Sequence, residues 1–100
     1  MMTLLIYDIP HDGARTKVSE LCLDYGLERV QYSAFEGQLR RTHQEELMLK
    51  VKKVLGKRAG DVRLISICEK DWANRLSVKN EKPAADKPSS TPVNGSGEKG

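Results

Sequence analysis

Residues 4–10 read Leu-Leu-Ile-Tyr-Asp-Ile-Pro, an apolar run that contains one carboxylate and ends at a proline. Apolar side chains occupy both alternating phases of this run, which is typical of a strand that is covered on both faces. Because successive side chains of a strand point to opposite faces, Leu4, Ile6 and Asp8 share one face. The run therefore predicts a central strand, and we expect its carboxylate to be solvated or to bind a ligand.

Two amphipathic helices are predicted on either side of the middle of the chain. The first starts with Asp12 as N-cap, continues with apolar side chains at helical spacing, and ends at Gly26. The second starts at a capping box formed by Thr42 and Glu45, shows a second apolar stripe, and ends at Gly56.

Further strands are predicted at residues 28–39 and 62–68. The first segment alternates twice, with a slip of register at Ala34 and Phe35, and this predicts two successive strands or one strongly bent strand. The second segment has aliphatic side chains in both phases, so we expect a second central strand. The resulting order β-α-β-β-α-β is that of an α+β, ferredoxin-like fold with two helices on one face of an antiparallel sheet.

The face of this sheet that lacks helices would be apolar. Leu4, Ile6 and part of the last strand lie on it, and a small monomeric protein rarely exposes such a patch. A domain of residues 1–78 would also bury only about 60% of its extended surface, so association helps to complete the core. We therefore expect a homodimer through the open face, which brings two copies of Asp8 toward one symmetry axis.

The end of the chain changes composition. Residues 72–78 alternate weakly and are predicted to form a short extra strand that pairs with the partner chain. Residues 79–100 are rich in Lys, Pro, Ser, Gly, Asn and Glu, and we expect a disordered polar tail.

Composition excludes several classes of protein. Cys22 and Cys68 match no zinc or redox spacing, and we expect both to be free, buried thiols. No apolar run approaches the roughly 18 residues that cross a membrane, and the N-terminal run lacks the pattern of a signal peptide. The expected location is the cytoplasm, without a membrane partner. The net charge of +3 favours a polyanionic partner only weakly.

A family resemblance is carried by three groups of residues. Tyr7 and Asp8 end the first predicted strand, Arg15 and Lys17 lie on the first helix, and residues 29–37 read Arg-Val-Gln-Tyr-Ser-Ala-Phe-Glu-Gly. Over residues 3–70 the chain resembles the CRISPR-associated protein 2 family. The resemblance implies a homodimer that acts in spacer acquisition for antiviral defence, beside the CRISPR integrase subunit. It also implies metal-dependent nuclease activity on RNA or double-stranded DNA.

Asp8 is the candidate catalytic residue and metal ligand under this resemblance. An isolated aspartate is more often a turn or capping residue, and one carboxylate alone holds Mg²⁺ poorly. Mg²⁺ is commonly held by one or two carboxylates together with waters and phosphate, so two Asp8 side chains across a dimer axis would suit it. The ion would act as a Lewis acid and lower the pKa of a bound water. We expect Mg²⁺, with Mn²⁺ as the alternative.

Three basic residues match family positions that approach nucleic acid, namely Arg15, Lys17 and Arg29. Lys17 stands where relatives often carry arginine, and lysine lacks the bidentate geometry of a guanidinium. A solvated helix face is the alternative interpretation. Contacts of this kind would be with the phosphate backbone, independent of base sequence and weakened by salt.

Three further residues are candidates for accessory roles. Tyr7 would either hydrogen-bond near the metal or pack beneath the first helix, and packing is favoured because it has the opposite phase from Asp8. Phe35 would either stack on a base or belong to the core. Ser33 would either bind a phosphate or stabilise the bend, and the second is favoured. His11 and His43 are expected to be surface residues without a catalytic role.

Three functions are compatible with these observations. The first is a metal-dependent endonuclease or endoribonuclease of the spacer-acquisition complex. The second is a non-catalytic dimeric scaffold that bridges the integrase and binds duplex DNA. The third is a toxin-like ribonuclease of related fold, or a small regulatory module without a link to CRISPR.

Overall fold

The computed structural model describes residues 1–80 of the chain. The elements in chain order are β1 (Met2–Asp8), α1 (Asp12–Asp24), β2 (Glu28–Gln31), β3 (Ala34–Gln38), α2 (Arg41–Leu55), β4 (Asp61–Ile67) and α3 (Glu69–Ala73).

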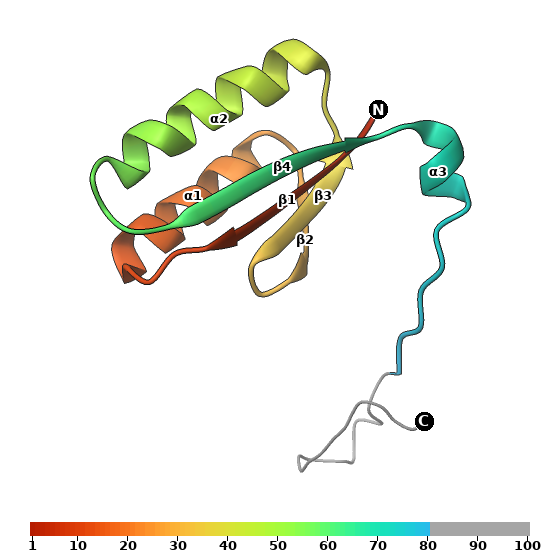
Figure 1. The fold of residues 1–100 in the computed structure, drawn as a ribbon, viewed down its shortest axis with the longest axis horizontal. Helices are drawn as coiled ribbons and strands as arrows, with labels where there is room; N and C mark the ends of the chain where they lie inside the picture. Colours follow the sequence, from red (N-terminus) through yellow and green to blue (C-terminus); the bar gives the residue numbers. More distant parts are fainter. Residues whose placement is uncertain (81–100) are drawn as a thin grey trace.

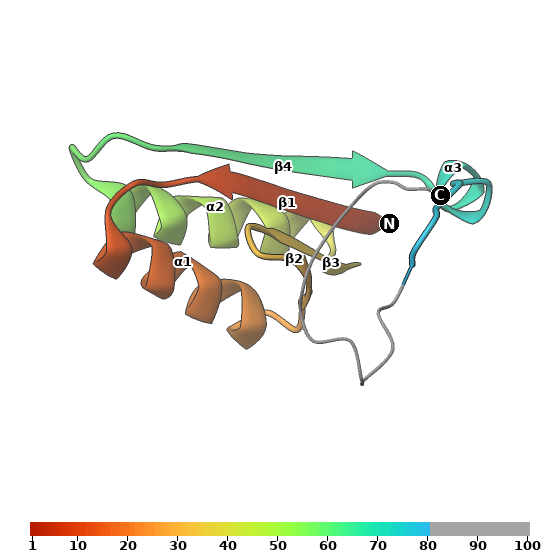
Figure 2. The ribbon, with the colours of Figure 1, turned by 90° about the horizontal axis from the view of Figure 1, so that it is seen from below.

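The strands form one antiparallel four-stranded sheet in the order β2-β3-β1-β4. Helices α1 and α2 lie together on one face, and no helix of residues 1–80 covers the other face (Figures 1 and 2). This arrangement confirms the predicted α+β, ferredoxin-like fold. β1 is a central strand, as expected, because β3 and β4 pair with its two edges.

The prediction that residues 62–68 form a second central strand was wrong. β4 lies at the edge of the sheet, and β3 is the second central strand. The aliphatic side chains of β4 occupy both phases for two separate reasons. Val62 and Leu64 are partly buried against the core under the helices, whereas Ile65 is 43% exposed in the other phase.

The core lies between the sheet and the helices. Leu5 and Tyr7 of β1 and Ile9 just after it share one phase and are at most 5% exposed, and Phe35 is fully buried beside them. At Gly37, β3 lies very close to Leu27, which lies just beyond the end of α1. A Cβ added at Gly37 would lie only 2.8 Å from a Leu27 side-chain carbon. The glycine permits this contact between sheet and helix layer.

Both ends of α1 are held by local hydrogen bonds. Gly26 has φ +85°, the Leu27 amide donates to the Cys22 carbonyl at 3.0 Å, and the Gly26 amide donates to the Leu23 carbonyl at 2.9 Å. These bonds form a Schellman motif and confirm the predicted stop. The predicted N-cap was wrong by one residue, since the helix begins at Asp12 and the His11 Nδ1 atom accepts from the Ala14 amide at 3.0 Å.

The predicted capping box of α2 was also wrong. The helix begins at Arg41, so Thr42 already lies in its first turn, and the N-cap residue Arg40 makes no side-chain capping bond. Glu45 instead pairs with Arg41, with 3.1 Å between Nε and Oε2. Gly56, with φ +55°, is the C-cap and confirms the predicted end.

Residues 28–39 form two strands, which confirms the first of the two alternatives. The break is at the turn of Tyr32 and Ser33, just before the slip seen in the sequence pattern. The pairing of β2 with β3 is also irregular between Arg29 and Gln31.

The open face of the sheet exposes apolar side chains in the single chain. Ile6 is 36% exposed and Ile65 is 43% exposed. Dimerisation through this face stays a prediction, as does the domain boundary at residue 78. The start of the predicted extra strand was wrong, because Trp72 and Ala73 lie in α3. Residues 74–80 have no regular secondary structure in the single chain, and pairing of this segment with a partner chain stays a prediction.

Most of the predicted tail lies outside the described residues. Within residues 1–80, no helix has the length and apolar character needed to cross a membrane.

One buried polar side chain ties α2 to the sheet. The Gln44 Nε2 atom donates to Thr3 Oγ1 at 2.9 Å and to the Leu39 carbonyl at 3.2 Å. Its Oε1 atom accepts from the Ser66 hydroxyl at 3.0 Å. Gln44 is 3% exposed and Thr3 is fully buried, so these bonds replace water that the groups have lost.

Replacement of Gln44 should therefore destabilise the fold. We expect Gln44→Leu to lower the free energy of unfolding by about 2–3 kcal/mol, because buried groups of Thr3 and Leu39 lose their partner. Gln38→Leu, at an exposed position of β3, is the control and should change stability by less than about 0.5 kcal/mol. Urea unfolding at a fixed protein concentration measures both. Equal stability of the two variants would contradict this role.

The two cysteines differ in environment, which corrects the expectation that both are buried. Cys22 is fully buried in the core, and burial raises the pKa of its thiol to about 11. Cys68 is exposed at the N-cap of α3, where its Sγ atom accepts from the Asp71 amide at 3.5 Å. Neither forms a disulfide.

This difference predicts selective thiol reactivity. The thiolate is the form that reacts with a disulfide reagent. At pH 8 we therefore expect the exposed Cys68 to react rapidly. Cys22 should react only after unfolding, because it is buried and its thiol pKa is raised. Absorbance of the released thiolate counts the modified groups in native protein and in guanidinium chloride. A Cys68→Ser variant should react only when unfolded, and rapid reaction of this variant in the native state would refute the prediction.

Candidate metal and nucleic-acid site

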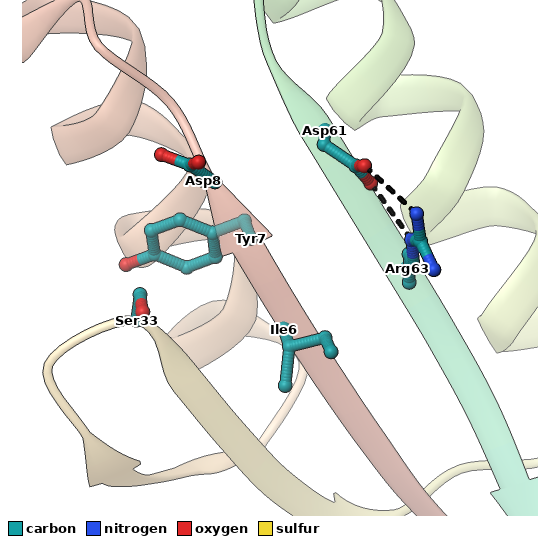
Figure 3. Close-up of a pocket in the computed structure, with 6 residues that line it drawn as sticks. All are labelled: Ile6, Tyr7, Asp8, Ser33, Asp61 and Arg63. Carbon is teal, nitrogen blue, oxygen red and sulfur yellow. Dashed lines mark hydrogen bonds and ion pairs between the residues drawn. The ribbon is translucent and has the colours of Figure 1, made fainter.

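Asp8 ends β1 on the open face of the sheet. Its side chain is exposed and makes no hydrogen bond or ion pair with any residue in 1–80. It borders a cavity of about 310 Å³ that is lined by Ile6, Tyr7, Asp8, Ser33, Asp61 and Arg63 (Figure 3). Since Pro10 prevents continuation of the strand and the preceding residues anchor it, the carboxylate is held at a strand end that is open to solvent.

A second carboxylate, which sequence reasoning missed, lies opposite Asp8. Asp61 begins β4 and pairs in register with Asp8, so both side chains belong to the same face of neighbouring strands. The sequence did contain Asp61 just before a predicted strand, but the register that sets it opposite Asp8 depends on tertiary pairing. In Figure 3 the two carboxylates point away from each other, Asp61 toward Arg63.

Asp61 is held by a bidentate ion pair. Arg63 donates from Nε to Oδ1 at 3.0 Å and from Nη2 to Oδ2 at 3.1 Å. This arginine lowers the pKa of the Asp61 carboxyl. It also balances the repulsion expected between like charges at opposed positions of a sheet. The cavity therefore contains one free carboxylate and one that is already paired.

The donor set of one chain is compatible with a weakly held hard cation. No cluster of three or more His, Cys, Asp or Glu side chains suited to a metal occurs in residues 1–80. Mg²⁺ retains waters and is commonly bound through one or two carboxylates plus phosphate oxygens, so the free Asp8 carboxylate fits that chemistry.

The structure brings two of the three predicted basic residues together. Arg15 donates from Nη1 to the Ile9 carbonyl at 2.9 Å and also pairs with Asp12. Arg29 donates from Nη2 to Ser19 Oγ at 2.6 Å. Both line a second cavity, of about 140 Å³, whose walls are Tyr7, Arg15, Thr16, Ser19, Arg29 and Tyr32. Lys17 is exposed on α1 and lines neither cavity.

The accessory candidates separate into core and site. Tyr7 packs in the core at 5% exposure, with its ring 6.2 Å from that of Phe35, as the favoured alternative required. Its hydroxyl donates to the Tyr32 carbonyl at 3.4 Å, and burial raises the pKa of this phenol. Phe35 is fully buried, so a role in base stacking is wrong and the core alternative holds.

Ser33 lies in the turn between β2 and β3 and lines the Asp8 cavity. Its carbonyl accepts from the Tyr7 amide at 3.1 Å, which links the turn to β1. His11 caps α1, and His43 contacts the Tyr25 ring edge-on at 6.3 Å between centroids.

The family of the chain follows from comparison with known proteins. The model of the family described as CRISPR associated protein Cas2 matches residues 1–75. This chain belongs to that family. The resemblance noted in the sequence is thereby confirmed, and the toxin-like ribonuclease and the regulatory module lose their support.

Relatives and solved structures agree with this membership. The "CRISPR-associated endoribonuclease Cas2 2" of Chloroflexus aurantiacus is 47% identical over 81 residues, covering 81% of this chain and 95% of the relative. The structure of Streptococcus pyogenes Cas2 at pH 6.5 matches with TM-score 0.66 and 25% identity, over 80% of this chain and 100% of that chain. A chain of a partial Cas6-RT-Cas1–Cas2 complex matches with TM-score 0.67 and 25% identity, over 89% and 95%.

The ion pair beside Asp8 yields a direct test. In Arg63→Ala we expect the Asp61 carboxyl to titrate at higher pH than in the unchanged protein, because its stabilising cation is gone. Because the pKa of the Asp61 carboxyl is lower in the folded than in the unfolded protein, the ion pair stabilises the fold at pH values above the unfolded pKa. This stabilisation is lost as the pH falls through the folded pKa.

Carboxyl ¹³C NMR titration measures this change. Arg41→Ala, which removes the arginine of an exposed ion pair on α2, is the matched control and should leave the Asp61 titration unaltered. An unaltered Asp61 titration in Arg63→Ala would show that the pair does not form in solution.

Proposed function

We propose that this protein is a metal-dependent phosphodiesterase of CRISPR adaptation, with Asp8 as its catalytic residue and metal ligand. The observation that carries the proposal is the free, solvent-accessible Asp8 carboxylate at the edge of a cavity of about 310 Å³. A relative named an endoribonuclease, 47% identical to this chain, supports the nuclease activity. RNA and double-stranded DNA both remain proposed substrates.

The residues around Asp8 have complementary roles in this proposal. Asp8, contributed by each protomer, would hold Mg²⁺ or Mn²⁺ together with phosphate oxygens. When bound, such an ion supplies Lewis-acid polarisation of the phosphate and acidifies a coordinated water. Arg63 faces the same cavity, and its bidentate bond to Asp61 leaves Nη1 for a phosphate oxygen. Ser33 lies on the opposite wall and offers a hydroxyl.

Nucleic acid would be held by Arg15, Lys17 and Arg29. Arg15 and Arg29 are oriented by bonds to the protein and share one cavity, whereas Lys17 is an exposed point charge on the same helix as Arg15. The contacts would be with phosphates, so binding should be independent of base sequence and weaken strongly with salt.

The proposed partners are a second copy of this chain and a Cas1-type integrase subunit. Exposed Ile6 and Ile65 on the open face support dimerisation there, which would also bring two Asp8 carboxylates together. The match to a chain of a complex that contains Cas1 and Cas2 supports the second partner. The cytoplasmic location expected from the sequence is part of this proposal.

A scaffold without catalysis is the second candidate. It is favoured by one observation, the bidentate bond between Arg63 and Asp61, which leaves each chain with a single free carboxylate at this cavity. In that case the same dimer and basic residues would bridge the integrase and bind duplex DNA, and Asp8 would have no chemical role.

Removal of the Asp8 charge separates the two candidates. Asp8→Asn should reduce cleavage of labelled RNA or duplex DNA by at least about 100-fold, the loss typical of removing a group that stabilises the transition state. EDTA should have the same effect, and Mg²⁺ or Mn²⁺ should restore activity. Light scattering should show that the variant is still a dimer.

Asp24→Asn, an exposed aspartate at the other end of α1, is the matched control and should cleave normally. Cleavage by Asp8→Asn at the original rate would refute the catalytic assignment. Spacer acquisition in cells that carry only Asp8→Asn would then support the scaffold.

A further inference from the structure

The turn between β2 and β3 presents an aromatic ring to solvent. Tyr32 is 70% exposed, and it is the only exposed residue among the five aromatic residues, all of which lie within residues 1–80. Tyr7 and Phe35 are buried in the core beside the turn, whereas the Tyr32 ring lies outside it.

The backbone that carries this ring is fixed. The Tyr32 carbonyl accepts from Arg29 Nη1 at 2.5 Å and from the Tyr7 hydroxyl at 3.4 Å. The next residue, Ser33, accepts from the Tyr7 amide at 3.1 Å. A turn held by three such bonds presents its aromatic side chain from a defined position, and little order has to be gained when a ligand binds.

Two guanidinium groups flank the ring. The Cζ atoms of Arg15 and Arg29 each lie 5.9 Å from the centroid of the Tyr32 ring, within the range of cation–π attraction. Both are held by the protein, Arg15 on the Ile9 carbonyl and Arg29 on Ser19. Because Tyr32 as a whole residue is 70% exposed with both arginines in place, much of it stays accessible to a ligand.

An open aromatic face beside two fixed cations complements a nucleotide. A base stacks on an aromatic ring whatever its sequence, and its phosphate is attracted by the guanidinium groups. The cavity of about 140 Å³ that these residues line is suited to a phosphate and part of a ribose rather than to an extended duplex. A base in a duplex is already stacked on its neighbours, so only an unpaired base can use this ring.

We propose that Tyr32, Arg15 and Arg29 form a subsite for one unpaired nucleotide, whose base stacks on Tyr32 and whose phosphate lies against the two arginines. The proposal rests on the proposed nucleic-acid function and makes it more specific. It assigns to the exposed Tyr32 the stacking that the buried Phe35 cannot provide. The substrate class is a single strand, or a duplex with an unpaired end.

Binding and fluorescence of short oligonucleotides test this subsite. Single-stranded RNA and DNA that carry 2-aminopurine are titrated with the full chain, in the original sequence and in Asp8→Asn. Tyr32→Ala should bind about 5- to 100-fold more weakly, the range for loss of one base–aromatic stack. Tyr32→Phe should bind within about twofold of the original protein and should still quench 2-aminopurine, because the ring is retained.

Three controls separate the contribution of the base from the contributions of the phosphate and of the turn. Val30→Ala shortens another exposed apolar side chain of the same hairpin and should leave binding unchanged. On an oligonucleotide with abasic sites, the original protein and Tyr32→Ala should bind equally, since no base is left to stack. A blunt duplex should also fail to distinguish these two proteins.

The binding experiments on Tyr32 and the cleavage experiments on Asp8 test separate claims. Equal binding and equal quenching by the original protein and Tyr32→Ala would overturn the subsite, even if Asp8→Asn abolishes cleavage. A loss of affinity that persists on abasic or blunt duplex substrates would also overturn it and assign Tyr32 a structural or phosphate-related role. Conversely, undiminished cleavage by Asp8→Asn would refute the catalytic role of Asp8 and leave the stacking result standing.

Discussion

The alternation of side chains along β1, in the middle of an antiparallel sheet, is the constraint on which the rest of the molecule depends. Leu5, Tyr7 and Ile9 enter the core under the two helices, so the intervening residues must face the other way. Asp8 is therefore exposed because its neighbours are buried. A one-residue slip of register would place Asp8 against the helices and expose Tyr7, at a large cost in free energy.

The arginines of this protein combine structural and functional roles. Arg15 is bonded to the end of β1, Arg29 to α1 and the hairpin turn, and Arg63 to Asp61. Each bond restricts a long side chain that would otherwise lose much entropy when it binds a ligand. Because a guanidinium has five N–H donors, a structural bond does not exhaust its capacity to bind phosphate. Lys17, without such a bond, contributes charge but no fixed geometry.

The two faces of the sheet differ in what they can do. The helix face is closed and contains the core, including the Gln44 hydrogen bonds that fix α2 to β1 and β4. The open face combines exposed Ile6 and Ile65 with the carboxylates of Asp8 and Asp61. The stacking subsite lies between the hairpin turn and α1, on the side of the sheet that carries the helices. Tyr7 lines both its cavity and that of Asp8.

The amino-acid sequence by itself determined the element order from β1 to β4, the central position of β1, the helix ends at Gly26 and Gly56, and the exposure of Asp8. These features follow from local periodicity and from the backbone freedom of glycine, which need no knowledge of distant contacts. The helix starts were less predictable, since several polar residues near each start compete for the cap.

Only the tertiary structure decided which residues meet. Strand pairing set Asp61 opposite Asp8 and moved β4 to the edge, and neither result can be read from alternation, because alternation assigns a face but not a neighbour. Packing likewise chose between two aromatic rings of one hairpin, burying Phe35 and leaving Tyr32 in solvent. The identity of the exposed ring depends on how much space the core provides, and that space exists only once helices and sheet are assembled.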